Sequence, residues 1–135
     1  MRVAFGTDES TPITRGIVGR LLEGGHEVDV LADGDAWPDA GRRVGQAVAA
    51  GRADLGIGCC WTGTGVSIAA NHADPAVRAA LCTDAETARG ARRWNDANVL
   101  ALSLRLLSEA LAEEIVVAFL DTAADESERT EIDRC

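Results

Sequence analysis

Two adjacent cysteines, Cys59 and Cys60, are the residues of this sequence best suited to chemistry. They stand shortly before a glycine-rich segment, Thr62-Gly63-Thr64-Gly65. A thiolate can carry a proton between carbon atoms, and the backbone N–H groups of a glycine-rich turn can stabilise an oxyanion. Neighbouring residues of a strand point to opposite faces of a sheet, so only one of the two thiols can face a site. We predict Cys60, because it is nearer the N-terminus of the following helix, where negative charge is stabilised.

Both features also have a purely structural interpretation. A cysteine at the end of a buried strand usually belongs to the core. The segment Gly63-Thr64-Gly65 could be no more than a tight turn. It is a poor dinucleotide fingerprint, because a third glycine is missing and the segment does not follow the first strand.

Two carboxylates, Asp8 and Glu9, follow the first predicted strand. In parallel α/β sheets, ligands bind beyond the carboxyl ends of the strands, at the point where the strand order reverses. For the order 2-1-3-4-5, which we predict, that point lies between the first and third strands. Asp8 and Glu9 would then lie close to Cys60. Asp8 could instead cap the helix that begins near Thr11.

The elements that must position these residues are short apolar runs that alternate with helical patterns, which is typical of a parallel sheet covered by helices. Strands are predicted at residues 2–6, 27–31, 53–59, 77–82 and 98–102. We therefore predict a Rossmann-like, three-layer α/β/α fold with a five-stranded parallel sheet. One domain would span residues 1–122, followed by an acidic C-terminal tail over residues 123–135.

The composition argues against several classes of function. The 135 residues include 22 acidic and 13 basic side chains, for a net charge of −9, which disfavours nucleic acid or an anionic membrane as partner. Every basic residue is an arginine, so Schiff-base catalysis and a Walker-type lysine are excluded. His26 and His72 are isolated and no Cys-x-x-Cys occurs, so we expect no metal and no other cofactor. No secretory leader or membrane span is recognisable, so a cytoplasmic location is expected.

Four segments resemble the family of type B ribose-5-phosphate isomerases and galactose-6-phosphate isomerases. They are RVAFGTDE (2–9), ADLGIGCCWTGTGVSIAANH (53–72), RAALCTDAETAR (78–89) and NDANVLAL (95–102). The resemblance continues almost without gaps from Met1 to about Thr122. It implies aldose–ketose isomerisation through a cis-enediol(ate), without a metal. It also implies a homodimer or tetramer whose active sites are shared between two subunits.

The resemblance further implies roles for individual residues. Cys60 matches the base that moves a proton between C1 and C2 of the sugar. Asp8 matches a carboxylate that binds sugar hydroxyls. The loop that holds the developing oxyanion is matched by Thr62, Gly63 and Gly65.

Three further matches concern the partner subunit and the phosphate. Asn95 matches an asparagine that contacts the substrate of the partner subunit. Arg105 matches an arginine that contributes to phosphate binding. The family's C-terminal Arg-His-x-x-Arg phosphate clamp falls near residues 127–132, where only Arg129 remains.

The chain departs from the family pattern at three other positions. Glu9 replaces a histidine, Trp94 replaces the histidine implicated in opening the sugar ring, and Trp61 replaces a glycine. A carboxylate near a phosphate dianion is unfavourable in a shielded pocket. The two tryptophans offer surfaces on which a sugar face or an aromatic group could stack, although each could equally serve packing.

These observations lead to one hypothesis with two alternatives. The hypothesis is a sugar isomerase, an intramolecular oxidoreductase, that uses Cys60 on a non-standard sugar that need not be phosphorylated. Glu9, Trp61 and Trp94 would then be part of the substrate site. The first alternative is a conventional ribose-5-phosphate isomerase that uses Arg105 and Arg129. The second is a non-catalytic member that acts as a binding or partner subunit.

Overall fold

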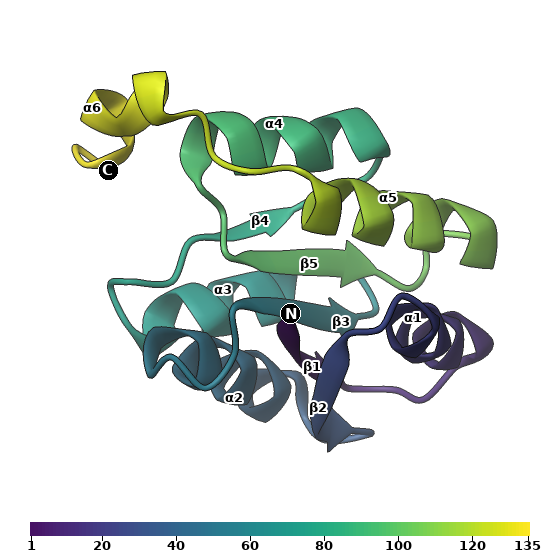
Figure 1. Ribbon diagram of the computed structural model, residues 1–135. Coiled ribbons are helices and arrows are strands. Elements are labelled where there is room, and N and C mark those ends of the chain that lie inside the picture. The colour runs from purple at the N-terminus through teal and green to yellow at the C-terminus, as the bar shows by residue number, and fades with distance from the viewer.

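The computed structural model describes residues 1–135, in which five strands alternate with helices (Figure 1). The elements, in chain order, are β1 (Arg2–Thr7), α1 (Pro12–Glu23), β2 (Glu27–Asp33), α2 (Trp37–Ala49), β3 (Leu55–Cys60), α3 (Thr64–Ala73), β4 (Ala79–Leu81), α4 (Ala85–Asn95), β5 (Val99–Ser103), α5 (Glu109–Asp121), the 3-10 turn η1 (Glu126–Glu128) and α6 (Arg129–Ile132). No helix combines the length and the apolar character that crossing a membrane would require.

The sheet is parallel and its order is β2-β1-β3-β5-β4. The prediction of a Rossmann-like parallel sheet is confirmed, but the predicted order 2-1-3-4-5 is wrong for the last two strands. Every residue of β5 is buried, whereas the three residues of β4 are only partly buried. The apolar β5 therefore occupies the inner position and the short β4 lies at one edge. The other edge is β2, which carries the acidic residues Glu27, Asp29 and Asp33.

Helices cover both faces of the sheet (Figure 1). The larger core lies under α1, α4 and α5, and Cys59 belongs to it. On the other face, two smaller clusters lie under α2 and α3, and one of them contains Cys60 with Ala40 and Val66. The two adjacent cysteines thus point to opposite faces, as the alternation along a strand requires.

Glycines allow α2 and α3 to approach each other closely. A Cβ atom at Gly41 would lie 2.7 Å from both the Cβ of Ala69 and the carbonyl oxygen of Val66. At Gly45 it would lie 2.7 Å from the carbonyl oxygen of Ala70. The two helices therefore pack with their backbones nearly in contact, and this fixes their N-termini at the carboxyl edge of the sheet.

The C-terminal segment is held against the end of α4 by one carboxylate. Asp96 has a left-handed backbone (φ 48°) and ends α4. Its carboxylate forms ion pairs with three guanidinium groups, those of Arg78 (3.2 Å), Arg92 (3.4 Å) and Arg129 (3.3 Å). Ile132 of α6 is buried. The acidic tail is therefore packed on the domain along residues 125–132, while the boundary at residue 122 stays a prediction.

Replacing Gly41 with Ala should lower the free energy of unfolding by about 1–3 kcal/mol, because the new methyl group meets the backbone of α3. The matched control is Gly19→Ala in α1, where a Cβ atom has no neighbour within 4 Å. That change should leave stability unchanged or raise it by up to about 1 kcal/mol, since Ala favours a helix interior. Urea unfolding of both variants measures the difference. Equal stability of the two variants would contradict the close packing of α2 on α3.

Candidate functional site

A cavity of about 410 Å³ opens where β1 and β3 end. It is lined by residues from the ends of these strands and from the N-terminal parts of α2 and α3, namely Asp8, Trp37, Cys60, Trp61, Thr62, Thr64, Gly65 and Ile68. We call it the Cys60 cavity. It lies at the switch point between β1 and β3, where α/β sheets bind ligands. A larger groove between α1, α4 and α5, about 640 Å³, is lined by side chains of both charges and no cysteine.

The Cys60 sulfur is held at the start of α3. The backbone N–H of Gly63 donates a hydrogen bond to it at 3.2 Å. Gly63 is the N-cap of α3 and has φ 78°, a conformation that favours glycine. A Cβ atom there would lie 2.5 Å from Cδ1 of Leu81. The sulfur thus faces a backbone donor and a helix N-terminus, both of which stabilise an anion.

Cys59 offers the contrasting environment. It is fully buried in the core beneath α1 and α5. Burial raises the pKa of its thiol, and the neighbouring Cys60 and Asp8 add to the effect. Burial likewise raises the pKa of Cys82 to about 11. Of the three buried cysteines, only Cys60 lines the cavity at the ends of β1 and β3.

Asp8 lines the Cys60 cavity, and its backbone N–H donates to the carbonyl oxygen of Cys59 at 3.2 Å. Partial burial raises the pKa of this carboxyl, and the negative charge of Glu9 raises it further. Asp8 does not cap α1, because Thr11 does so through a capping box with Thr14. Glu9 is exposed beside the cavity rather than in its lining.

The loop after Cys60 is tied to the end of β5. The carbonyl oxygen of Trp61 accepts hydrogen bonds from the Ser103 hydroxyl and the Arg105 backbone N–H, both at 3.0 Å. Within the loop, the hydroxyls of Thr62 and Thr64 lie 2.7 Å apart. The Arg105 guanidinium makes no ion pair within the chain and does not line the Cys60 cavity.

Trp37 is a cavity residue that the sequence analysis missed. It begins α2, and a Cβ atom at Gly65 would lie 2.8 Å from its ring atoms Cδ2 and Cε3. The indole therefore lies flat against the first turn of α3. Its position in the sequence could have indicated that Trp37 lies near the site. Every helix that follows a parallel strand begins at the carboxyl edge of the sheet, and Trp37 is the first residue of such a helix. The sequence analysis also missed Ile68, which lies one turn after Thr64, the first residue of α3.

Three predicted site residues lie at the opposite edge of the sheet. Helix α4 carries the chain back over about 16 Å, so Trp94 and Asn95 lie at the amino edge, away from Cys60. Arg129 is also there and pairs with Asp96 and Glu126. Within one copy of the chain, these residues therefore do not reach Cys60, and their roles in a site shared between subunits stay predictions. The reason is the direction of α4.

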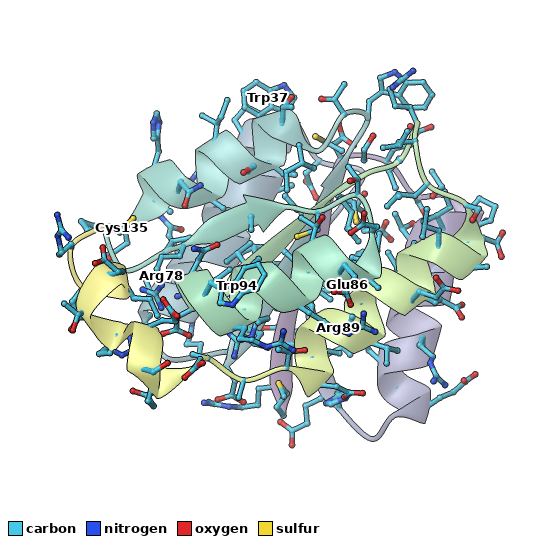
Figure 2. All side chains as sticks on the ribbon, turned by 90° about the horizontal axis from the view of Figure 1, so that it is seen from above. Trp37, Arg78, Glu86, Arg89, Trp94 and Cys135 are labelled. Atoms are coloured by element: carbon cyan, nitrogen blue, oxygen red, sulfur yellow. The ribbon has the colours of Figure 1, made fainter.

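Trp94 and Asn95 border a second cavity of about 380 Å³, which we call the Trp94 cavity. Figure 2 shows Trp94 near Arg78 and Cys135, beside the C-terminal segment, whereas Trp37 lies at the top of the view. The Trp94 ring lies over Gly90, where a Cβ atom would be 2.7 Å from Cζ3. No group of three or more His, Cys, Asp or Glu side chains is placed to hold a metal ion.

Comparisons with known proteins agree with this architecture. The sequence model of the family described as Ribose/Galactose Isomerase matches residues 3–134. Ribose-5-phosphate isomerase B of Escherichia coli (strain K12) is 39% identical over 127 residues, which cover 88% of this chain and 83% of that protein. D-erythrulose-4-phosphate isomerase of Pectobacterium atrosepticum is 36% identical over 96 residues, covering 71% of this chain and 62% of that protein.

A solved structure extends the similarity to three dimensions. Ribose-5-phosphate isomerase B of Clostridium thermocellum superposes with a TM-score of 0.90 at 36% identity, covering 99% of this chain and 94% of that chain. The match of the family model over nearly the whole chain, together with this shared fold, establishes the relationship. The chain belongs to the ribose/galactose isomerase family, whose named members are sugar phosphate isomerases.

Proposed function

We propose that this protein is an aldose–ketose isomerase in which the Cys60 thiolate transfers the proton through a cis-enediol(ate). The observation that carries the proposal is the hydrogen bond from the Gly63 N–H to the Cys60 sulfur, inside an open cavity at the switch point of the sheet. Membership in a family of sugar isomerases supports the class of reaction.

In this reaction, the thiolate removes a proton from the carbon next to the sugar carbonyl. The C–H electron pair becomes the double bond of the enediolate, and the carbonyl oxygen takes up the negative charge. Backbone N–H groups of the loop over residues 62–65 are the donors available to that oxygen. The hydroxyl proton on the carbon that lost its proton passes to the oxyanion on the adjacent carbon, its cis neighbour, so that the deprotonated carbon becomes the new carbonyl. The S–H group delivers its proton to the former carbonyl carbon, and the thiolate is regenerated without a cofactor.

The charges around the Cys60 cavity support a non-standard sugar without a phosphate as the substrate. Asp8 is the only charged residue in the lining, and Glu9 adds a second negative charge nearby. Arg129 is engaged by Asp96 at the other edge of the sheet. Carboxylates accept hydrogen bonds from sugar hydroxyls and repel a phosphate dianion. Trp37 and Trp61 add apolar surfaces for a sugar ring.

Ribose 5-phosphate is the second candidate substrate. The relatives named above act on sugar phosphates, and Arg105 lies on a loop joined to Trp61 with its guanidinium free of ion pairs. A second copy of the chain would add its own side chains to the Cys60 cavity. We propose a homodimer with shared sites, because Asn95 cannot reach Cys60 of its own chain.

Replacing Cys60 with Ala should reduce the exchange of the substrate's α-proton with deuterated solvent by roughly 10²–10⁴-fold, the usual contribution of a general base. Cys59→Ala is the matched control, since it removes a thiol one residue away that faces the core. That variant should retain exchange at equal folded concentration. The measurement is proton NMR of the sugar in deuterium oxide. Retained exchange in the Cys60 variant would exclude this residue as the base.

Ligand binding to the native state raises the melting temperature by mass action, so a thermal-shift screen can identify the substrate class. We expect unphosphorylated pentoses, hexoses or aminosugars to stabilise the protein more than their phosphates do. Larger stabilisation by ribose 5-phosphate would favour the second candidate. Stabilisation by a sugar that never exchanges its α-proton would indicate a binding subunit rather than an enzyme.

Replacing Asp8 with Asn should make the protein more stable than the wild type at neutral pH while raising KM for the sugar. The pKa of Asp8 is raised in the folded state, so its ionised form destabilises folding. This penalty disappears as the pH falls through the raised pKa, and the two proteins should converge in acid. Urea unfolding against pH measures the effect.

Asp54→Asn is the control of opposite sign. Hydrogen bonds from Arg2 lower the pKa of Asp54, so its ionised form stabilises the fold. This variant should be less stable than the wild type at neutral pH, and the difference should vanish as the pH falls. Identical pH profiles for both variants would contradict the distinct environments of the two carboxylates.

A further inference from the structure

Three large apolar side chains are exposed around the Cys60 cavity. Trp37, Trp61 and Ile68 line it and are 45%, 60% and 54% exposed. The Trp94 cavity has one exposed residue of this kind, Trp94 itself, and the groove between α1, α4 and α5 has none. A single exposed apolar residue is ordinary on a protein surface, but a group of them at one cavity indicates that an apolar group binds there.

The polar groups of the cavity are taken up by the reacting end of the sugar. In the proposed reaction, the carbonyl end lies between the Cys60 sulfur and the loop over residues 62–65. Asp8, the only charged residue in the lining, is left to accept hydrogen bonds from hydroxyls. The hydroxyls of Thr62 and Thr64 are bonded to each other at 2.7 Å. The lining therefore holds no charged group for the far end of the sugar.

Trp37 and Ile68 form an apolar wall beyond the loop that holds the thiol. The Trp37 indole lies against Gly65, in the first turn of α3. Ile68 follows Gly65 by three residues, a spacing that places both on one face of the helix. It also lies about 6 Å along the helix axis from Thr64. The part of the cavity that is farther along α3 is thus bordered by an indole on one side and an aliphatic side chain on the other.

The size of the cavity leaves room for a substituent on the sugar. Its volume of about 410 Å³ lies in the range of pockets that hold drug-sized ligands, roughly 300–1,000 Å³. Such ligands are larger than a free pentose. A hydroxyl or a phosphate placed against the apolar wall would lose water without gaining a hydrogen-bond partner. An alkyl or aryl group would instead bury apolar surface there, which favours binding.

We propose that the Cys60 cavity binds a sugar whose terminal carbon carries an alkyl or aryl group in place of a hydroxyl or a phosphate. Trp37 and Ile68 contact this apolar group, while Cys60 and Asp8 face the polar part of the sugar. This inference deepens the proposed function and rests on it, because it names the substrate class of the same site. The proton transfer at Cys60 is unchanged by it.

A series of ribose derivatives that differ only at the terminal carbon tests the substrate class. In the probes, hydrogen, a methylthio group or a propylthio group replaces the terminal hydroxyl, and ribose 5-phosphate is the charged comparison. Isothermal titration should show that affinity rises from the methylthio to the propylthio sugar by about fourfold for each of the two added methylenes. We call this rise the propyl gain. Equal affinity for these two sugars, or tighter binding of ribose 5-phosphate than of the propylthio sugar, would overturn the proposal.

Substitutions in the apolar wall test which residues contact the apolar group. Ile68→Gln places a polar amide on the wall and spares the core, because Ile68 is exposed. Both Ile68→Gln and Trp37→Ala should lose most of the propyl gain. Leu22→Gln is the matched control, because Leu22 is 58% exposed but lies on α1, and it should keep the full gain. A full propyl gain in either wall variant would contradict the proposed contact.

A second copy of this chain is the rival explanation for the exposed apolar residues, and sedimentation equilibrium of the same variant separates the two. If Ile68 served only as a contact between copies, Ile68→Gln would weaken self-association and leave the propyl gain intact. That result would overturn the proposal. Loss of the propyl gain at a protein concentration where Ile68→Gln and the wild type have the same oligomeric state would support it.

Exchange of the α-proton with deuterated solvent separates this inference from the proposed function. We expect the propylthio sugar to bind most tightly and to exchange its α-proton in the presence of the wild type. Exchange in ribose or ribose 5-phosphate, without a propyl gain, would overturn the apolar substrate class and leave the isomerase intact. A propyl gain without exchange in any of the sugars would uphold the apolar site and overturn the isomerase.

Discussion

The hydrogen bond between the Gly63 N–H and the Cys60 sulfur is the interaction on which the proposed chemistry depends. It exists because β3 ends at Cys60 and the chain turns at once into α3, through a residue with positive φ. A side chain at this turn would collide with Leu81 on the edge strand β4. The strand order therefore affects the surroundings of the thiol. With β4 beside β5, Leu81 lies so close to residue 63 that only a glycine fits there.

The walls of the Cys60 cavity also depend on glycines that allow close packing. Gly41 and Gly45 let α2 approach α3, and Gly65 lets the Trp37 indole lie against the first turn of α3. Because Trp37 begins one helix and Thr64 begins the other, the contact between α2 and α3 sets the width of the cavity mouth. The opposite wall, around Trp61, rests on hydrogen bonds to the end of β5. One wall is therefore fixed by packing and the other by polar contacts.

The sequence allowed local features to be predicted well and long-range ones only in part. The strand that ends at the cysteines, and the opposite directions in which Cys59 and Cys60 point, follow from a local rule, the alternation of strand side chains. The exchange of β4 and β5 could not be found in this way, because both segments are short and apolar. Their order follows from burial, since β5, which is fully buried, takes the inner position and the partly buried β4 takes the edge. Trp37 was missed because its surroundings depend on which helix ends share an edge of the sheet.

Edge strand β2 has a consequence for how this protein can associate. Its acidic residues, Glu27, Asp29 and Asp33, lie along an unpaired edge of the sheet. Like charges brought face to face repel, so two such edges resist joining into a continuous sheet across molecules. The charges on β2 therefore oppose fibril-like growth at this edge. This favours colloidal stability where it matters most, because β2 is longer than the other edge strand, β4.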